Sequence, residues 1–280
     1  MPTTPSQAYP LGNTQAEHER LARQAARFAY VTEHAFRRAG VGPGQRVLEL
    51  GSGAGDVAML VAELVGPSGE VLGIERDSDS IAWARARAQS AGLTNVRFTQ
   101  SDVADLPAGN PFDVALGRFI LMFVPDPVTV MRSVARQVRP GGIIVFLEVT
   151  WSATLHVAGH LPLWNAALTT IHQAIQHAGA RPEQGPDLYR VFRSAGLPAP
   201  TMHLETMLGA SRDLTAWPSD LLKSMRPQIA KAGISLDGLG DLDTLAERLH
   251  AEVEASGAVV PEIGMVSAWC TTTDRENTPQ

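Results

Sequence analysis

Glycines and a carboxylate cluster in one stretch of this 280-residue sequence in a way that could hold a small charged ligand. Gly51, Gly53 and Gly55 follow the apolar run Val47–Leu50, which contains Glu49. Glycine has no Cβ, so the backbone can turn sharply there and approach a ligand closely. Residues 57–64 have helical spacing, so the turn leads to a helix N-terminus, where free N–H groups favour an anionic or acceptor group.

The spacing of the glycines limits which ligand they could hold. A dinucleotide-binding turn needs a third glycine at position 56, where this sequence has Asp56, and the lysine–serine pair of a P-loop is absent. A cluster of glycines also fits a purely structural turn. The polar residues that follow must therefore decide between a binding site and a turn.

Apolar runs alternate with helical patterns along the first half of the chain. Strands are predicted at residues 47–50, 71–75, 95–99, 112–116 and 142–148, and helices at 13–39, 57–64, 78–91 and 128–138. This alternation indicates βαβ crossovers and a doubly wound, mainly parallel sheet.

Polar residues occur where these predicted strands end. Glu75 ends the second strand about 20 residues beyond the glycines, where a carboxylate commonly binds ribose hydroxyls. Asp102 follows the third strand and could accept from an adenine amine, and Gly117 and Arg118 follow the fourth. Each acid alone could be a solvated charge or a helix cap. Because the carboxyl ends of parallel strands share one edge of the sheet, together they predict a nucleotide site.

The ordered set of motifs carries a family resemblance. Glu49–Gly55, Gly73–Glu75, Gln100–Val103, Phe112-Asp113 and Arg139–Gly142 resemble the successive motifs of class I S-adenosylmethionine-dependent methyltransferases, over about residues 42–149. They are most similar to bacterial small-molecule enzymes of the ubiquinone and menaquinone type. The resemblance implies S-adenosylmethionine as cofactor and a Rossmann-like, seven-stranded, mainly parallel α/β sheet whose last strand is antiparallel. Residues 202–207 and 263–269 are the expected strands six and seven.

The resemblance also implies which residues contact the methionine end of the cofactor. They are Glu49, Gly51, Ser52, Gly53, Gly117 and Arg118. Glu49 is expected near the ammonium group. Arg118 departs from the commoner Asn or Ser of the family, and a guanidinium there could pair with the cofactor carboxylate. The alternative is a salt bridge from Arg118 to Glu148 or another nearby acid.

The nucleoside end of the cofactor has its own expected contacts. Glu75 would hold the ribose hydroxyls, Arg76 would border the adenine, Asp102 would accept from its amino group, and the N–H of Val103 would meet a ring nitrogen. The resemblance extends to an N-terminal cover segment. Tyr9 would shield the sulfonium and Gln24 would bind the cofactor tail, although ordinary packing explains both side chains equally well.

Three regions are expected from this pattern. Residues 1–40 form the N-terminal arm and cover helix, and residues 41–150 the cofactor-binding core. Residues 151–280 are expected to be helical lid insertions, with helices at 161–178, 214–229 and 242–253, together with C-terminal strands that complete the same sheet.

Candidate acceptor and catalytic residues follow the strand ends. Phe119, Met122 and Trp151 could line an acceptor pocket or be ordinary core residues. His156 and His160 are the candidate general bases, with His172 and His177 as further histidines of the insertion. No metal site is expected, because Val157 stands where a zinc-protease motif has Glu and no third ligand is evident.

The expected reaction is in-line methyl transfer to a small organic acceptor, in which the protein aligns the acceptor and removes water. O-methylation is favoured, with N- or C-methylation as alternatives. Two other function classes stay open. One is a non-catalytic protein that binds S-adenosylmethionine, and the other is an NAD-dependent oxidoreductase, against which Asp56 speaks.

Composition excludes several other partners. The net charge of −6 and a pI near 5.7 argue against nucleic acid and anionic membranes, and no apolar run could span a bilayer. The single cysteine, Cys270, fits a reducing compartment, and no secretory signal is evident. A cytoplasmic protein with a small-molecule acceptor is expected. The sequence marks no interface, and an oligomer is compatible with it.

Overall fold

The computed structural model describes residues 15–106, 109–157 and 160–273. Their elements are α1 (Gln15–Ala39), β1 (Arg46–Leu50), α2 (Asp56–Val65), β2 (Glu70–Glu75), α3 (Ser78–Ser90), β3 (Val96–Gln100), β4 (Phe112–Arg118), α4 (Pro127–Gln137), β5 (Val138–Thr150), α5 (Ser152–Val157), α6 (Pro162–His177), α7 (Gln184–Ser194), β6 (Thr201–Glu205), β7 (Leu208–Gly209), α8 (Arg212–Ser224), α9 (Arg226–Lys231), α10 (Leu245–Ser256), β8 (Val260–Pro261) and β9 (Gly264–Thr271). Short 3₁₀ turns occur at Leu121–Phe123 and Asp237–Leu239.

The chain forms two compact units, which we call the sheet unit and the helical unit. The sheet unit comprises the described residues within Ala22–Val149, Glu183–Glu205 and Met265–Gln280, and the helical unit comprises those within Met1–Leu21, Thr150–Pro182 and Thr206–Gly264. Within the described residues, no helix combines the length and apolar character needed to cross a membrane.

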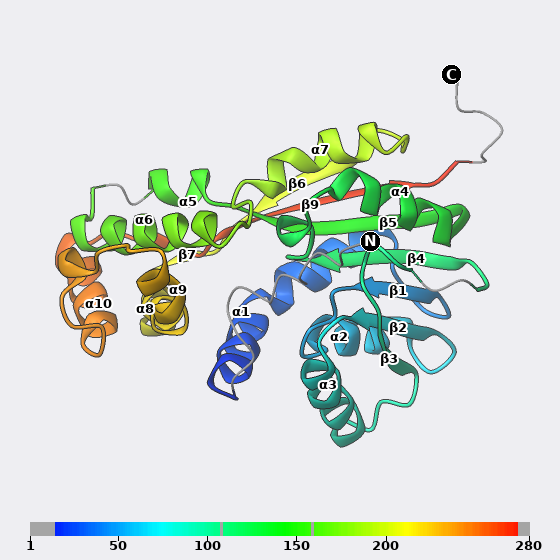
Figure 1. Cartoon of the computed structure of the whole chain (residues 1–280), viewed down its shortest axis with the longest axis horizontal. Helices are drawn as coiled ribbons and strands as arrows, with labels where there is room; N and C mark the ends of the chain where they lie inside the picture. The colour runs from blue at the N-terminus through cyan, green and yellow to red at the C-terminus, as the bar shows by residue number, and fades with distance from the viewer. Residues whose placement is uncertain (1–14, 107–108, 158–159, 274–280) are drawn as a thin grey trace, which may run out of the picture. The chain divides into compact units, whose positions relative to one another are not determined.

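The sheet unit contains a seven-stranded sheet in the order β3-β2-β1-β4-β5-β9-β6 (Figure 1). Neighbouring strands from β3 to β5 are parallel, whereas β9 is antiparallel to β6. The predicted fold class is therefore confirmed. Order reverses at β1, where the chain first adds β2 and β3 on one side and then β4 on the other, and this reversal is where open α/β sheets bind ligands.

Apolar side chains explain why the central strands lie inside this unit. Val47, Leu48 and Leu50 of β1 are fully buried, as expected for a parallel strand covered on both faces. Helices α4 and α7 contact each other and pack on this core, to which α7 contributes Leu188 and Phe192. The core thus fixes β1 and its neighbours in register.

Three elements differ from those predicted. Residues 151–280 were expected to be helical lid insertions and C-terminal strands, but α7 packs into the sheet unit because one face of the helix is apolar. Strand β5 begins at Val138, before the predicted start, and its pairing with β4 shifts register between Phe112 and Val114. The helix predicted at 214–229 is two helices, α8 and α9, because Pro227 lies in the first turn of α9 and cannot continue the preceding helix.

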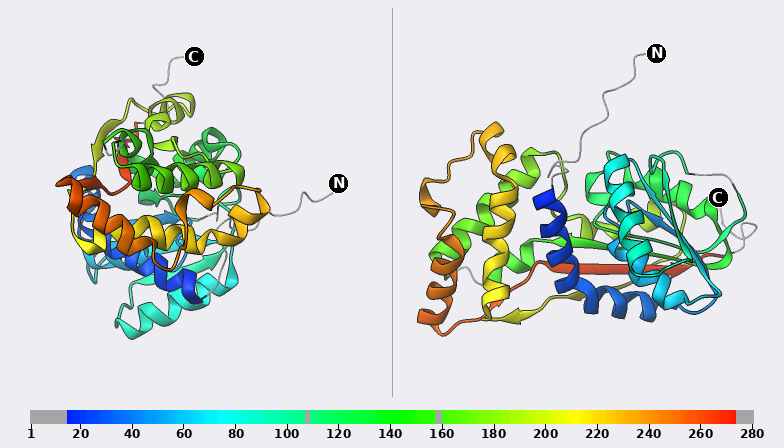
Figure 2. Two further views of the ribbon diagram at one scale, coloured as in Figure 1. Left: turned by 90° about the vertical axis from the view of Figure 1, so that its left-hand side faces the viewer. Right: turned by 90° about the horizontal axis from the view of Figure 1, so that it is seen from below.

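The helical unit gathers α5, α6, α8, α9 and α10, which lie together in Figures 1 and 2. Its core contains three tryptophans. The rings of Trp151 and Trp164 both meet Trp217 edge-on at 6.0 Å, and all three side chains are almost completely buried. Glu252 of α10 ties the helices together by accepting from the N–H groups of Leu163 and Trp164, both at 2.8 Å.

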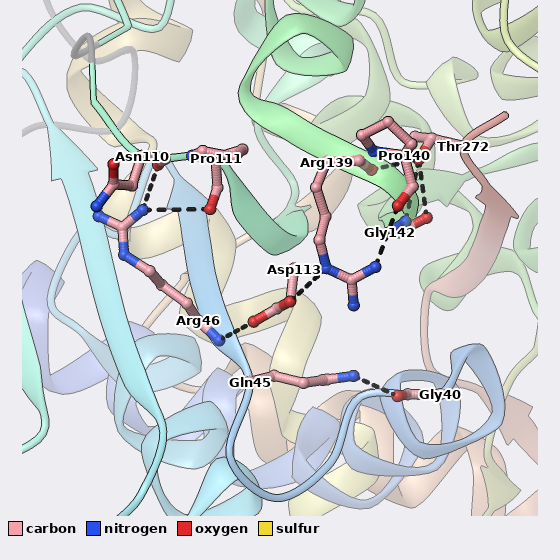
Figure 3. A network of polar contacts seen from close by, with 10 residues as sticks. All are labelled: Gly40, Gln45, Arg46, Asn110, Pro111, Asp113, Arg139, Pro140, Gly142 and Thr272. Atoms are coloured by element: carbon pink, nitrogen blue, oxygen red, sulfur yellow. Dashed lines mark hydrogen bonds and ion pairs between the residues drawn. The ribbon is translucent and has the colours of Figure 1, made fainter. Parts of the chain in front are cut away.

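The amino-terminal edge of the sheet carries a polar network centred on Asp113 (Figure 3). Its two carboxylate oxygens accept from the backbone N–H of Arg46 at 2.7 Å and from Arg139 Nε at 2.6 Å. These hydrogen bonds to the arginines outweigh partial burial and lower the pKa of Asp113. Thr272 then joins the strand β9 to Gly142 through its backbone N–H at 2.8 Å. This edge is therefore a structural clamp across β1, β4, β5 and β9.

Candidate functional site

The glycine turn after β1 adopts a conformation that explains its composition. Gly51, Gly53 and Gly55 have φ values of +65°, +49° and +85°. Residues that carry a Cβ rarely adopt this backbone conformation. Gly55 also precedes α2 as its N-cap. A Cβ built on Gly53 meets no atom within 4 Å, so the turn presents bare backbone there. The turn thus combines a left-handed backbone, open space and the start of a helix.

Strand register brings the predicted site residues to one edge of the sheet. Leu50 is opposite both Ile74 of β2 and Gly117 of β4, and Glu75 is opposite Gln100 of β3. The residues that follow these positions are consequently neighbours, because all four strands point the same way.

Glu75 connects its strand directly to the glycine turn. Its Oε2 accepts from the backbone N–H of Gly53 at 3.0 Å, and its Oε1 accepts from those of Arg76 and Asp77 at 2.8 and 3.0 Å. Three backbone donors fix the carboxylate, although an ionised carboxylate can accept about four hydrogen bonds in all. Glu75 therefore shapes the turn and retains acceptor capacity.

The segment after β3 is more open. Asp102 is exposed, and its Oδ1 accepts from the N–H of Ala104 at 2.9 Å. Val103 is partly buried against the core of the sheet unit, and Arg76 is exposed, with its carbonyl accepting from Gln100 at 3.0 Å. These residues form the rim of the same edge.

Glu49 is the most unusual acid of this edge. Its side chain is 2% exposed, and Oε2 has no hydrogen-bond partner within the described part of the chain. Burial raises the pKa of Glu49 to about 8, with the charges of Asp56 and Glu75 acting in the same direction and Arg118 opposing them. The Ser52 hydroxyl is likewise buried without a partner among the described residues.

Arg118 is held by an unexpected residue. Its Nη1 donates to Thr32 Oγ1 of α1 at 2.9 Å, and among the described residues it forms no ion pair with Glu148 or with another acid, so the predicted alternative of a salt bridge is wrong. Burial lowers the pKa of Arg118, while the negative charges of Asp56 and Glu49 oppose that shift. Glu148 instead accepts from the N–H groups of Ile120 and Leu121 at 3.0 and 2.6 Å.

Phe119 stands in a strained conformation at the end of β4. Its φ of +56° is the sole positive value for a non-glycine residue among those described, and such a conformation costs about 1–3 kcal/mol. The ring packs edge-on against Phe28 of α1 at 5.5 Å. The backbone N–H of Phe119 donates to the carbonyl of Leu147 at 2.9 Å. Strain maintained by such contacts is common at functional sites.

Sequence reasoning missed the contribution of α1 to this segment. Thr32 and Phe28, both buried, hold Arg118 and Phe119. The sequence predicted a helix at residues 13–39, on which an apolar residue such as Phe28 gave only the signal of a core residue. Thr32 gave a weak signal of its own, because a hydroxyl that becomes buried in a helix needs a hydrogen-bond partner.

The remaining predicted residues lie in different places. Met122 is buried in the sheet unit, whereas Trp151 is buried in the helical unit, where it contacts Trp217 and His172 edge-on. Gln24 is a partly buried residue of α1, and Tyr9 lies outside the described residues. The roles of these residues stay predictions.

The candidate bases are exposed. His156 lies in α5, and its ring Nδ1 is 2.6 Å from the carbonyl of Ser152 in the same helix. His160 follows the end of α5 and is also exposed. The two histidines therefore do not share one helix. In the described part of the chain, no group of three or more His, Cys, Asp or Glu side chains could hold a metal ion.

The residues at this edge fit an S-adenosylmethionine ligand. Two orphaned buried polar atoms, Glu49 Oε2 and Ser52 Oγ, require partners that the described chain does not provide. Gly53 leaves room where a Cβ would project, and Glu75 offers carboxylate acceptors beside it. An acid, a hydroxyl, bare backbone and a guanidinium suit a ligand that carries an ammonium, a carboxylate and ribose hydroxyls.

Comparison with known proteins identifies relatives of this chain. Two curated relatives are a ubiquinone/menaquinone biosynthesis C-methyltransferase from Ectopseudomonas mendocina, 38% identical over 39% of this chain and 43% of its own length, and an arsenite methyltransferase from Aquipseudomonas alcaligenes, 36% identical over 38% and 33%. The chain thus spans about half the length, or less, of the curated relatives it matches.

A solved structure supports the same fold. The YcgJ protein from Bacillus subtilis is 15% identical, with a TM-score of 0.56 over 88% of this chain and 99% of that one. A family model described as a methyltransferase domain matches residues 42–196, which is more than half of this chain. This match speaks against the NAD-dependent oxidoreductase. The chain belongs to the methyltransferase-domain family, the class I enzymes whose cofactor is S-adenosylmethionine.

Proposed function

We propose that this protein transfers the methyl group of S-adenosylmethionine to a small organic acceptor, and that an oxygen atom of a phenol or similar hydroxyl is the favoured acceptor atom. The observation that carries this proposal is the pair of orphaned buried polar atoms, Glu49 Oε2 and Ser52 Oγ, beside the left-handed glycine turn. A purely structural turn would not need them. A ligand with donor and acceptor groups would satisfy both.

Two opposite charges would recognise the amino-acid end of the cofactor. Glu49 and Arg118 lie on the neighbouring strands β1 and β4 and form no direct ion pair. Thr32 accepts from one Nη of Arg118, and a guanidinium has five N–H donors, so others remain for a carboxylate. The ammonium would then lie toward Glu49 and the carboxylate toward Arg118, with Gly51, Ser52 and Gly117 alongside.

Acids at the ends of β2 and β3 would bind the nucleoside. Glu75 is already fixed by three backbone donors, which would preorganise its remaining lone pairs for the ribose hydroxyls. Asp102 and Val103 would contact the adenine edge and Arg76 its rim. Of the side chains in this set, Glu75 is held by the most hydrogen bonds, so we expect it to dominate the affinity for the nucleoside.

When bound, the cofactor supplies a methyl group activated by its sulfonium charge, so the chain has to orient the acceptor and exclude water. The sequence predictions for acceptor-pocket residues are Phe119 and Met122 in the sheet unit and Trp151 in the helical unit. His156 donates from Nδ1 to its own helix, which leaves Nε2 as the proton acceptor. His156 and His160 are the proposed bases for a hydroxyl acceptor.

The names of two relatives raise two further acceptors, a ring carbon and arsenite. The ring carbon is compatible with the proposed class of acceptor, whereas arsenite is less so. A phenolate is nucleophilic at oxygen and at its ring carbons, so a C-methylating relative is compatible with the same class of acceptor. Arsenite is less compatible, because a soft metalloid prefers thiolate ligands. The chain has one cysteine, Cys270, which is buried, and burial raises the pKa of its thiol to about 12.

The test uses the full chain with methyl-labelled S-adenosylmethionine and a panel of phenols, hydroquinones, quinone precursors, amines and arsenite. Labelled methyl on a phenol or hydroquinone is the expected result, and NMR of the product would distinguish an O-methyl from a C-methyl group. Transfer only to amines or arsenite would overturn the acceptor class. Binding of S-adenosylmethionine without transfer to any acceptor would favour the non-catalytic alternative.

Substituting the histidines tests the proposed base. His156→Ala or His160→Ala should lower kcat about 100-fold for a hydroxyl acceptor, with the loss decreasing as pH rises. His177→Ala is the matched control, because His177 is exposed and its Nδ1 meets the carbonyl of Gln173 at 2.9 Å in the same way. Equal rates in all three variants would remove both residues from the mechanism.

A cytoplasmic location, independence of nucleic acid and the oligomeric state stay predictions from the sequence.

A further inference from the structure

Glu49 combines two properties that rarely persist together in a free protein. Its carboxyl is almost completely buried in β1, and Oε2 makes no hydrogen bond within the described residues. An ionised carboxylate in this setting would lose its hydration without gaining a donor. Protonation removes the charge and the need for most of that compensation.

Three charged side chains of the sheet unit act on Glu49, each from a different element. Arg118 of β4 favours the ionised form, but its guanidinium donates to Thr32 and does not reach Glu49 as an ion pair. Asp56 of α2 and Glu75 of β2 disfavour ionisation, and Asp56 is paired with Arg87 at 2.6 Å. The charge of Arg118 therefore fails to offset burial, and the pKa of Glu49 is raised to about 8.

We propose that Glu49 is protonated in the free protein and releases this proton to solvent when the ammonium group of the cofactor binds beside it. In this step the carboxyl O–H bond breaks, the proton passes to buffer, and the carboxylate becomes the partner of the ammonium. No other bond changes. The inference rests on the proposed position of the amino-acid end of the cofactor, and it adds a coupling between binding and proton release.

The physical basis of the coupling is charge compensation. A cation placed within about 4 Å of a carboxylate in a protein interior interacts with it by several kcal/mol, enough to lower a raised pKa by some units. Below pH 8, binding of the ammonium must therefore be accompanied by loss of the proton. Affinity for any ligand that carries this ammonium should rise with pH, whereas affinity for the nucleoside alone should not.

Calorimetry of the full chain with S-adenosylhomocysteine measures the released proton directly. Titrations at pH 7.0 in phosphate and in Tris, which differ in ionisation enthalpy, give the number of protons exchanged. We expect release of roughly 0.5–1 proton per ligand bound, from a pKa near 8. The second ligand is 5′-methylthioadenosine, which shares the nucleoside but lacks the amino-acid end, and its binding should release almost none.

Two variants assign the proton to one residue. Glu49→Gln should bind S-adenosylhomocysteine with almost no proton release. Glu70→Gln is the matched control, because Glu70 lies in the neighbouring strand β2 at the other end of the sheet, where it is exposed and paired with Arg46. This variant should release as many protons as the unmodified protein.

The outcomes separate this inference from the proposed function. If S-adenosylhomocysteine binds without proton release, or if Glu49→Gln releases as many protons as the unmodified protein, the coupling is overturned and the cofactor site stands. Absence of binding to the unmodified protein would overturn the cofactor site and the coupling together.

If Glu49→Gln fails to fold, a measurement on the unmodified protein still tests the coupling. Between pH 6 and 7.5, the ratio of the affinities for S-adenosylhomocysteine and 5′-methylthioadenosine should increase about tenfold per pH unit, because one proton is lost. A ratio that does not change with pH would overturn the coupling.

Discussion

The two ends of the central sheet differ in how their carboxylates are hydrogen-bonded and in the direction of their pKa shifts. At the amino-terminal edge, Asp113 receives donors on both oxygens, and its pKa is lowered (Figure 3). At the carboxyl-terminal edge, Glu49 is buried with one oxygen that receives no hydrogen bond from the described residues, and its pKa is raised to about 8. Buried polar atoms that form hydrogen bonds stabilise a fold. Buried polar atoms without a partner reduce stability, and they persist where a ligand can supply the missing hydrogen bond. The contrast distinguishes the structural clamp from the candidate binding site within one sheet.

The largest expected effect separates the ends of a single strand, β2. Glu75→Ala should weaken binding of S-adenosylhomocysteine at least 100-fold, or about 3 kcal/mol, because it removes the ribose acceptors and releases the N–H of Gly53. Glu70→Ala, at the amino end of the same strand, should leave affinity within about twofold. Calorimetry measures both, and similar losses would mean that the edges do not differ in function.

The pH dependence of stability should also differ between the ends. The folded pKa of Glu49 is raised, so its contribution to stability is full below the unfolded value near 4.3 and is lost as pH rises through about 8. Glu49→Gln should therefore stabilise the free protein at pH 9, by on the order of 3 kcal/mol, and have little effect at pH 4. Urea unfolding at both pH values measures the difference. A variant that is less stable at pH 9 would contradict the assignment of Glu49 as a strained acid.

The amino-terminal clamp should respond in the opposite direction. Asp113→Ala removes the acceptor of Arg46 and Arg139 and should lower the free energy of unfolding by about 2 kcal/mol at pH 7. The folded pKa of Asp113 is lowered, so this contribution is present above the unfolded value near 3.9 and is lost as pH falls below it. The variant and the unmodified protein should thus converge in stability in acid, as urea titrations would show. Cofactor affinity should be unchanged, and a large loss would mean that the two ends are coupled.

The smallest expected effect concerns two matched glycines. Gly53 and Gly92 have φ values of +49° and +70°, and a Cβ on either meets no atom within 4 Å. Alanine should therefore cost about 1 kcal/mol of stability at each position. Only Gly53→Ala should also weaken cofactor binding, by about tenfold, because its methyl group would project into the binding site. Thermal unfolding and calorimetry measure the two effects, and equal affinities would place the ligand elsewhere.

Local patterns predicted the strands and glycine turn well, because they depend on neighbouring residues. The apolar runs beginning at Val47 and Val71 correspond to β1 and β2, and the strand-end acid Glu75 was found from spacing alone. The antiparallel last strand came from the family resemblance, and its pairing with β6 confirms it.

Contacts between distant residues were not predictable in the same way. Thr32 and Arg118 are 86 residues apart, and a helical period carries no information about that pairing. The raised pKa of Glu49 was missed for a related reason. The family resemblance predicted it near the cofactor ammonium, but only the folded sheet shows that Oε2 receives no donor from the described residues. The predicted acceptor residues stay untested because their roles depend on packing rather than on a local motif.

The order of segments in the two units affects which parts of the gene can be exchanged by recombination. Apart from residues before position 22, the helical unit is encoded by two continuous stretches, Thr150–Pro182 and Thr206–Gly264. Both stretches interrupt the chain between strands of the sheet unit, after β5 and after β6. Recombination could therefore replace either stretch with that of a relative while leaving β1 to β4, the glycine turn and the Asp113 clamp intact. A gene built in this way would test whether the helical unit selects the proposed methyl acceptor, because the glycine turn and the candidate cofactor residues of the sheet unit would be unchanged.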